Sequence, residues 1–308
     1  MLVKKLMMDK QLQLTVVMPV YNNGPYLAAA VDSILNQTYL EFKFIIIDDG
    51  STDDSLAILQ SYANKDARIK LISRENRGLV ATRNELLSLT HTQYFAIMDS
   101  DDISYPNRLE RQLSFLENQP DYGIVGCRDM LIDPDGLAIR VINDNCTHED
   151  IDQANLSFDV FQTLNAYMAV TEKVKAIGGY RDEIIYAEDR DIFLRMAEIA
   201  KVMVLPETLY AYRQHYTNTC VTKAKAVSLN VRQVVDNACQ RRGTSIAMPE
   251  VGAHPENITV AQLHNVWAWW ALTEGNLKTA RKYARKVLMK KPLSINSWRL
   301  LLCVSRGY

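Results

Sequence analysis

The stretch FKFIIIDDGSTD, residues 42–53, decides the fold class because an apolar run ends abruptly in a polar turn. Residues 42–47 are aromatic and β-branched at most positions, which predicts a buried strand. The turn over residues 48–53 is rich in Asp, Gly, Ser and Thr, and a short helical pattern over residues 53–62 follows it. The sequence therefore predicts a strand, a polar turn and a helix in that order.

The same unit is predicted on both sides of this stretch. Upstream, a strand over residues 12–20 leads to a helix that opens at Pro25, and proline suits a first helical turn. Downstream, the predicted elements are strands over residues 68–73 and 93–98 and a helix over residues 78–89. Strands that alternate with helices pair in parallel through right-handed crossovers. We therefore expect an α/β fold with a Rossmann-like, mostly parallel central sheet flanked by helices.

Each of the four predicted strands ends in polar, turn-forming residues. In an open parallel sheet the ligand lies beyond the carboxyl ends of the strands. The four turns are therefore expected to meet at one edge of the sheet and to form a site there: residues 21–24, 48–53, 75–78 and 99–102.

The rest of the chain is less regular and then becomes entirely helical. The predicted elements are strands over residues 123–127, 201–205 and 208–212, a turn over 133–136 between two strands, and helices over 171–177 and 188–200. Only helices are predicted after about Val221, and residues 268–292 resemble one tetratricopeptide-type hairpin. One such hairpin cannot bury its own apolar face, so packing on the main domain is the simpler interpretation and a partner-binding module the alternative. We expect a main domain over residues 1–220 and an all-helical extension over residues 221–308.

Composition and charge exclude several classes of protein. The 35 Lys and Arg nearly balance the 36 Asp and Glu, which argues against a nucleic-acid binder. The five cysteines are scattered, which favours a reducing compartment and argues against a zinc site. No apolar run of 18 residues occurs, and the sequence MLVKKLMMDK at the start has no signal-peptide pattern. We expect a cytoplasmic protein, with peripheral contact at the inner face of the membrane and the oligomeric state left open.

The segment over residues 278–291 is strongly basic. A solvated helix face is the simpler interpretation, and a membrane-facing patch is the alternative. Its cations are Lys278, Arg281, Lys282, Arg285, Lys286, Lys290 and Lys291.

Acidic residues follow two of the predicted strands. Asp99, Asp101 and Asp102 lie at one strand end, and carboxylate oxygens suit a hard cation such as Mg²⁺ or Mn²⁺. A helix cap and a solvated acidic turn explain the motif as well when it is taken alone. His215 could join a metal site only if the fold returns it to the region of Asp101.

Two further groups allow a functional and a structural interpretation. Asp49 could accept an N–H from a flat heterocycle on which Tyr21 stacks, or it could cap the next helix. Glu188 and Asp189 open a helix, where the dipole favours acids, and either could serve as a general base. The two interpretations stay open on these motifs alone. Arg83 could reach a diphosphate or form a surface salt bridge.

Taken in order along the chain, these motifs resemble the family 2 glycosyltransferases with the GT-A fold. The matching segments are Val17 to Asn22, Ser33 to Tyr39, Asp48 to Asp53, Asn76 to Gly78, Asp99 to Asp102, and Glu188 with Asp189. The resemblance covers residues 14–215 approximately and leaves the helical extension unexplained. It implies a nucleotide-sugar half over about residues 12–102 and an acceptor half over about 103–220.

The resemblance also implies a reaction. The family transfers a sugar from a nucleotide diphosphate donor, usually UDP-linked, to an acceptor hydroxyl, with inversion and with the help of Mn²⁺ or Mg²⁺. A glycan, a lipid-linked molecule or another hydroxyl compound would be the acceptor, and bacterial cell-surface polysaccharide or glycan synthesis the setting.

Roles for individual residues follow from the resemblance by position. Tyr21 stacks on the base, Asp49 accepts a uracil N–H, and Arg83 approaches the nucleotide or its phosphates. Asp189 is the base, and Glu188 supports it. The other residues implied in nucleotide-sugar binding are Pro19, Asn22, Asn76, Gly78, Asp99 and Ser100.

The metal site is implied in the same way. Asp99 and Asp101 form a DXD motif, and Asp101, Asp102 and His215 are the groups expected at the metal.

Two other function classes compete with this interpretation. A sugar-phosphate nucleotidyltransferase would favour a glycine-rich GxGxRL-type signature near the N-terminus, where this chain has Asn22-Asn23-Gly24-Pro25. A catalytically silent nucleotide-sugar-binding or scaffold protein would keep the fold without turnover.

Overall fold

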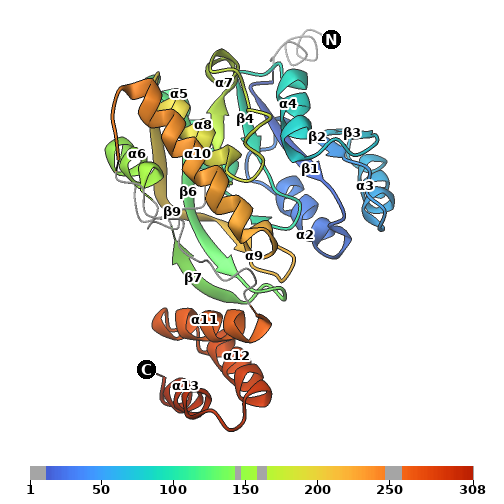
Figure 1. Ribbon diagram of the computed structural model, residues 1–308. Helices are drawn as coiled ribbons and strands as arrows, with labels where there is room; N and C mark the ends of the chain where they lie inside the picture. The colour runs from blue at the N-terminus through green and yellow to red at the C-terminus, as the bar shows by residue number, and fades with distance from the viewer. Residues whose placement is uncertain (1–11, 143–146, 158–164, 247–258, 308) are drawn as a thin grey trace.

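A computed structural model describes residues 12–142, 147–157, 165–246 and 259–307. Within these residues a nine-stranded mixed sheet has the order β3-β2-β1-β4-β8-β6-β9-β5, and β7 pairs with β6 (Figure 1). Helices cover the sheet, and a separate group of helices follows at the C-terminal end. The predicted α/β class with helical C-terminal segments is confirmed.

The N-terminal half of the sheet is parallel, as predicted. Its strands are β1 (Leu14–Val20), β2 (Phe42–Asp48), β3 (Ile69–Ser73) and β4 (Tyr94–Ile97). The helices α2 (Gly24–Leu35), α3 (Ser55–Ala63) and α4 (Leu79–Leu89) connect them. The carboxyl ends of the four parallel strands therefore meet at one edge of the sheet.

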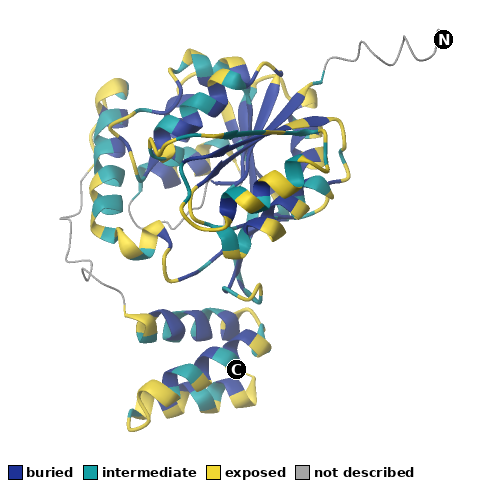
Figure 2. Ribbon diagram, turned by 90° about the vertical axis from the view of Figure 1, so that its right-hand side faces the viewer, coloured by how far each residue is buried: buried dark blue, intermediate teal, exposed yellow. Residues whose placement is uncertain are grey.

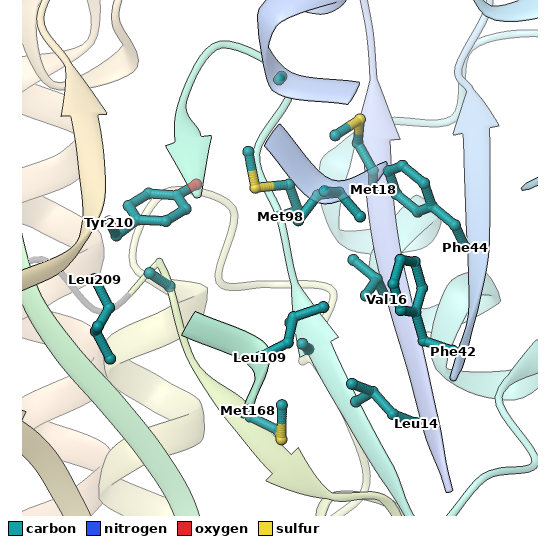
Figure 3. Packing of buried hydrophobic residues seen from close by; sticks show 14 of the residues in the cluster. Leu14, Val16, Met18, Phe42, Phe44, Met98, Leu109, Met168, Leu209 and Tyr210 are labelled. Atoms are coloured by element: carbon teal, nitrogen blue, oxygen red, sulfur yellow. The ribbon is translucent and has the colours of Figure 1, made fainter. Parts of the chain in front are cut away.

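Strand β1 is buried on both faces, because successive side chains of a strand point to opposite sides. Val16 and Met18 pack in one core layer with residues of α2 and β2 (Figure 3). Val17 packs in the opposite layer with residues of β2 and α4. This double burial fixes the end of β1 with respect to its neighbours.

The C-terminal half of the sheet mixes parallel and antiparallel pairs. Its strands are β5 (Ile103–Ser104), β6 (Tyr122–Ile132), β7 (Ala138–Ile142), β8 (Met168–Val170) and β9 (Lys201–Arg213). Its helices are α5 (Arg108–Asn118), α6 (His148–Leu156), α7 (Thr171–Ala176) and α8 (Glu188–Ala197). Strand β8 runs antiparallel to both β4 and β6 and joins the two halves.

The two strands predicted over residues 201–205 and 208–212 are one strand, β9. Its pairing with β6 shifts register where Cys127 faces Leu205 and Arg128 faces Thr208. Pro206 lies in this shift and has no N–H to donate to a ladder. A bulge therefore absorbs the proline, and the strand continues to the residues before His215.

The C-terminal helices form two groups. Helices α9 (Thr219–Thr222) and α10 (Ala224–Arg242) lie against the sheet part, where Val234 and Ala238 pack with Ile184 and Leu194. The boundary predicted at residue 220 thus precedes a helix that packs on the main domain. The second group contains α11 (Val260–Thr273), α12 (Leu277–Lys290) and α13 (Ile295–Arg306).

The helices α11 to α13 pack on strand β7. Leu131, Ile139 and Ile142 share one core with Trp267, Tyr283 and neighbouring residues of these helices. Polar contacts add to this packing, because Thr279 Oγ1 donates to the Ala138 carbonyl at 2.6 Å and Asn276 Nδ2 to the Ile139 carbonyl at 3.0 Å. Lys282 also pairs with the fully buried Asp133.

Tyr216, just beyond β9, reaches the same helices. Its hydroxyl lies 2.8 Å from His264 Nε2, and its ring lies 5.8 Å from that of Trp267.

Among the described residues, no helix is long and apolar enough to cross a membrane.

Candidate functional site

A cavity of about 920 Å³ opens at the carboxyl ends of β1, β2 and β4. All but one of the predicted site residues line it, as the parallel topology leads one to expect. These residues are Pro19, Tyr21, Asn22, Asp49, Asn76, Gly78, Arg83, Asp99, Ser100, Asp101, Glu188, Asp189 and His215. The exception is Asp102.

Asp49 and Tyr21 form one end of the cavity. Half of the Tyr21 surface is exposed, so its ring can receive a flat partner. Asp49 is buried and accepts the backbone N–H groups of Arg77 at 2.8 Å and Gly78 at 2.9 Å, and it pairs with Arg74. Two carboxylate oxygens offer about four acceptor positions, of which these contacts fill three. These contacts therefore leave one acceptor position of Asp49 unfilled.

The turns after β1, β2 and β4 are tied to one another. Asn22 has a positive φ of 53°, and its Oδ1 accepts the N–H of Thr52 at 2.7 Å. Asn23 Nδ2 donates to Ser100 Oγ at 2.6 Å. At Gly50 a Cβ atom would lie 2.7 Å from the backbone nitrogen of Asn76, so only glycine fits this approach. The turns at this edge of the sheet are therefore held in place by contacts with one another.

Arg83, buried beneath the cavity, joins three carboxylates from distant parts of the chain. Its Nη1 lies 2.8 Å from Glu188 Oε1 and 2.5 Å from Asp189 Oδ1, and its Nη2 lies 3.2 Å from Asp99 Oδ1. Burial raises the pKa values of Asp99, Glu188 and Asp189, that of Asp189 well above the usual value, and the Arg83 guanidinium opposes each shift. Arg83 thus orients the three acids rather than standing free in the cavity.

The fold brings His215 back to Asp101, 114 residues earlier in the chain. His215 Nε2 lies 3.0 Å from Asp101 Oδ2, and His215 Nδ1 lies 2.8 Å from Thr217 Oγ1. The imidazole packs against Tyr26 with ring centroids 5.2 Å apart. These contacts fix the orientation of the His215 ring toward the acid.

Asp102 lies behind the cavity wall instead of in it. It is fully buried, and its two oxygens accept the backbone N–H of Arg213 at 2.7 Å and Asn165 Nδ2 at 3.0 Å. We expected Asp102 at the metal, but its buried position does not match that role. Asp102 instead anchors the end of β9, two residues before His215.

The donor chemistry of the site fits a divalent cation. Among the described residues, no group of three or more His, Cys, Asp and Glu side chains is arranged to hold a metal. Asp101 and His215 form a two-residue set, and Mg²⁺-like ions bind one or two carboxylates and complete their shell with water and substrate phosphates. Five acids lie around this pair, Asp99, Asp101, Asp102, Glu188 and Asp189, and the Arg83 guanidinium pairs with three of them, so a cation would offset part of the negative charge.

Several residues at the cavity carry no recognisable sequence signal. Asn165 is 7% exposed, and its Oδ1 has no hydrogen-bond partner among the described residues. Val227 and Val231 of α10 also line the cavity. A single Asn and two valines of a helix have no motif around them in the sequence. The two valines are found only because α10 packs beside the cavity.

A sequence profile of the family described as Glycosyl transferase family 2 matches residues 15–173. An uncharacterized glycosyltransferase of Methanocaldococcus jannaschii, MJ1057, is 32% identical over 67% of this chain and 72% of its own length. The hyaluronan synthase of Pasteurella multocida is 27% identical over 74% of this chain, which corresponds to 23% of the synthase.

Two solved structures share the fold. S. aureus TarS 1–349 in complex with UDP-GlcNAc has a TM-score of 0.57 and 16% identity, over 96% of this chain and 89% of that one. The mannosyltransferase PcManGT from Pyrobaculum calidifontis, in complex with GDP-Man and Mn²⁺, has a TM-score of 0.56 and 17% identity, over 96% and 84%.

Proposed function

Because the chain belongs to glycosyl transferase family 2 and is a glycosyltransferase, we propose that it moves a sugar from a UDP-sugar to an acceptor hydroxyl with inversion. One observation carries this proposal. A single cavity is lined by Tyr21 and Asp49, by the pair Asp101 and His215, and by the half-buried acid Asp189. The transfer of a sugar from a nucleotide needs a place for the base, a place for the diphosphate and a general base, all within reach of one donor molecule.

Asp49 and Tyr21 would receive the base of the donor. The fourth acceptor position of Asp49 suits the N–H of uracil, while the exposed Tyr21 ring offers a stacking surface. The hydrogen bonds among the neighbouring turns hold both groups in place before the donor arrives. One open acceptor position matches the single N–H of uracil, which is why we propose UDP as the nucleotide.

Asp101 and His215 would hold Mn²⁺ or Mg²⁺ together with the diphosphate. When bound, the cation would neutralise the charge that develops on the leaving diphosphate. Each of these groups positions the donor rather than taking part in bond formation.

Asp189 would act as the general base. Its carboxylate takes the proton of the acceptor hydroxyl while that oxygen bonds to the anomeric carbon, and the bond from this carbon to the diphosphate oxygen breaks with its electron pair. A single in-line displacement of this kind inverts the anomeric carbon. Arg83 holds Asp189 through Oδ1 at 2.5 Å, and Glu188 shares the same guanidinium.

We propose that the acceptor is a saccharide. The hyaluronan synthase among the relatives supports polysaccharide or glycan synthesis. Free thiols at Cys127, Cys220, Cys239 and Cys303 support the expected cytoplasmic location.

Thermal unfolding with UDP, GDP and their sugar conjugates, with and without Mn²⁺, tests the donor assignment. A ligand at 100 times its Kd stabilises the native state by about 2.7 kcal/mol, which raises the Tm by several degrees. We expect the largest shift with a UDP-sugar and Mn²⁺. A larger shift with GDP compounds would overturn the uracil assignment, and no shift in a folded sample would support the catalytically silent alternative.

The change Asp101→Asn is expected to remove the Mn²⁺-dependent part of that shift and to lower kcat/KM by about 100-fold or more, because a metal contributes several kcal/mol to the transition state. His215 remains, but its acid partner at 3.0 Å is neutral in this variant. The exposed Asp121→Asn serves as the matched control. Equal Mn²⁺ dependence in both variants would exclude Asp101 from the metal site.

A further inference from the structure

The C-terminal helices carry a charge that the rest of the chain does not. Residues 277–308 contain nine Lys and Arg and no Asp or Glu. The whole chain has 35 basic and 36 acidic residues, so the first 276 residues hold 26 against 36 and have a net charge of −10. One short helical unit is thus strongly cationic beside an anionic main part.

Exposed apolar side chains gather in the same unit. Leu293 is 99% exposed, Ile295 82%, Met289 73%, Trp298 55% and Leu302 53%. These five lie within fourteen residues at the turn between α12 and α13 and along α13. We call them, with the exposed cations Lys290, Lys291, Arg299 and Arg306, the C-terminal patch (Figure 2).

The geometry of α13 separates this patch from the core. At about 100° per residue, Ile295, Trp298 and Leu302 fall on one side of the helix, and Arg299 and Arg306 fall between or beside them. Ser297, Leu300 and Val304 lie on the opposite side and are buried against the other helices. The apolar residues and the cations therefore face outward together.

Trp298 braces the turn that presents the patch. Its indole Nε1 donates to the Pro292 carbonyl at 2.8 Å, which ties the first turns of α13 to the segment before it. An aromatic ring with a polar N–H beside lysines and exposed aliphatic side chains is the composition of a membrane-interface surface. A solvated helix face would need the cations but would gain nothing from five exposed apolar side chains.

We propose that the C-terminal patch binds the surface of a bilayer that contains anionic phospholipids. The cations would lie among the lipid phosphates, and the apolar side chains would enter the boundary between headgroups and acyl chains. A second copy of this chain fits the patch poorly, because a symmetric contact would bring the four exposed cations of one patch against the same four of the other. The proposal does not rest on the identity of the donor or of the acceptor.

Flotation of the full chain with vesicles tests the proposal. Vesicles of phosphatidylcholine alone are compared with vesicles that also contain phosphatidylglycerol, at low and at high salt. We expect binding to the anionic vesicles, with a loss at high salt because surface charges are screened. The double variants Lys290→Glu with Lys291→Glu and Trp298→Ser with Leu302→Ser should each reduce bound protein at least about tenfold.

Matched variants on the sheet part control for general effects of charge and polarity. Leu40 is 61% exposed, and Lys65 and Lys70 are exposed near β3. Leu40→Ser and the double variant Lys65→Glu with Lys70→Glu should bind as the unchanged chain does. Nucleotide-induced thermal shifts should stay equal in all variants, which separates this test from that of the donor.

Three outcomes would overturn the proposal. They are no flotation with either vesicle, equal binding to neutral and anionic vesicles, and equal binding by the patch and control variants. Reversible self-association in sedimentation, abolished by the patch variants, would assign the surface to a second copy. Binding only to an acidic protein would assign it to that class of partner.

Discussion

Replacing Asp189 by Asn is expected to lower kcat by about 10²- to 10⁴-fold, the range in which a positioned general base contributes. The amide has nearly the same shape as the carboxyl group, and its oxygen can still accept from Arg83 Nη1, which lies 2.5 Å from Asp189 Oδ1. Tyr21 and Asp49, where we propose that the base of the donor binds, are unchanged. UDP-sugar binding should therefore persist while transfer is lost.

Initial rates and donor-induced thermal shifts measured on the same sample check this result. Asp182→Asn removes an exposed acid seven residues earlier and should keep both activity and binding. A variant at Asp189 that retains a third or more of the wild-type kcat would show that another group takes the proton. Loss of donor binding together with activity would place Asp189 on the donor side instead.

The change Arg83→Gln is expected to reduce the free energy of unfolding by about 3–5 kcal/mol, because buried charges lose their partner. Arg83 is 3% exposed and contacts Asp99, Glu188 and Asp189. Its cation also lowers the pKa of Asp189, which burial raises. Without it that pKa rises further, so the acidic limb of the kcat/KM profile should move to higher pH.

Urea unfolding and a pH–rate profile measure the two effects separately. Arg77→Gln is the control, because the Arg77 side chain is 63% exposed and lies 3.8 Å from Glu85, a contact of at most about 1 kcal/mol. Unchanged stability in Arg83→Gln would show that the three acids are neutral in the folded chain. An acidic limb that stays in place would separate Arg83 from the ionisation of the base.

The N-terminal half of the sheet could be predicted because each strand is an apolar run closed by a turn. The other half of the sheet has weaker sequence patterns. Strand β8 has three residues and β5 has two, which is too short for any periodic pattern. Helix α5 buries Arg108 and Gln112 together with Leu109, Leu113 and Leu116, so its buried face mixes polar and apolar residues. Pro206 splits the pattern of β9, although pairing with β6 carries the strand through.

The site follows the same division. Residues at the ends of parallel strands could be predicted to meet, since topology alone brings them to one edge. The contact of His215 with Asp101 depends on the path of β9 across the sheet, which no local pattern records. The position of Asp102 could not be predicted for a related reason. Which of two adjacent acids faces a cavity depends on the backbone rotation at that turn.

His215 and Tyr216 are consecutive residues with different neighbours. His215 contacts Asp101 in the cavity, and Tyr216 contacts His264 and Trp267 in α11. One peptide bond thus separates a residue that lines the cavity from a residue that packs on α11. A displacement of Tyr216 together with α11 would therefore act on the backbone directly beside His215.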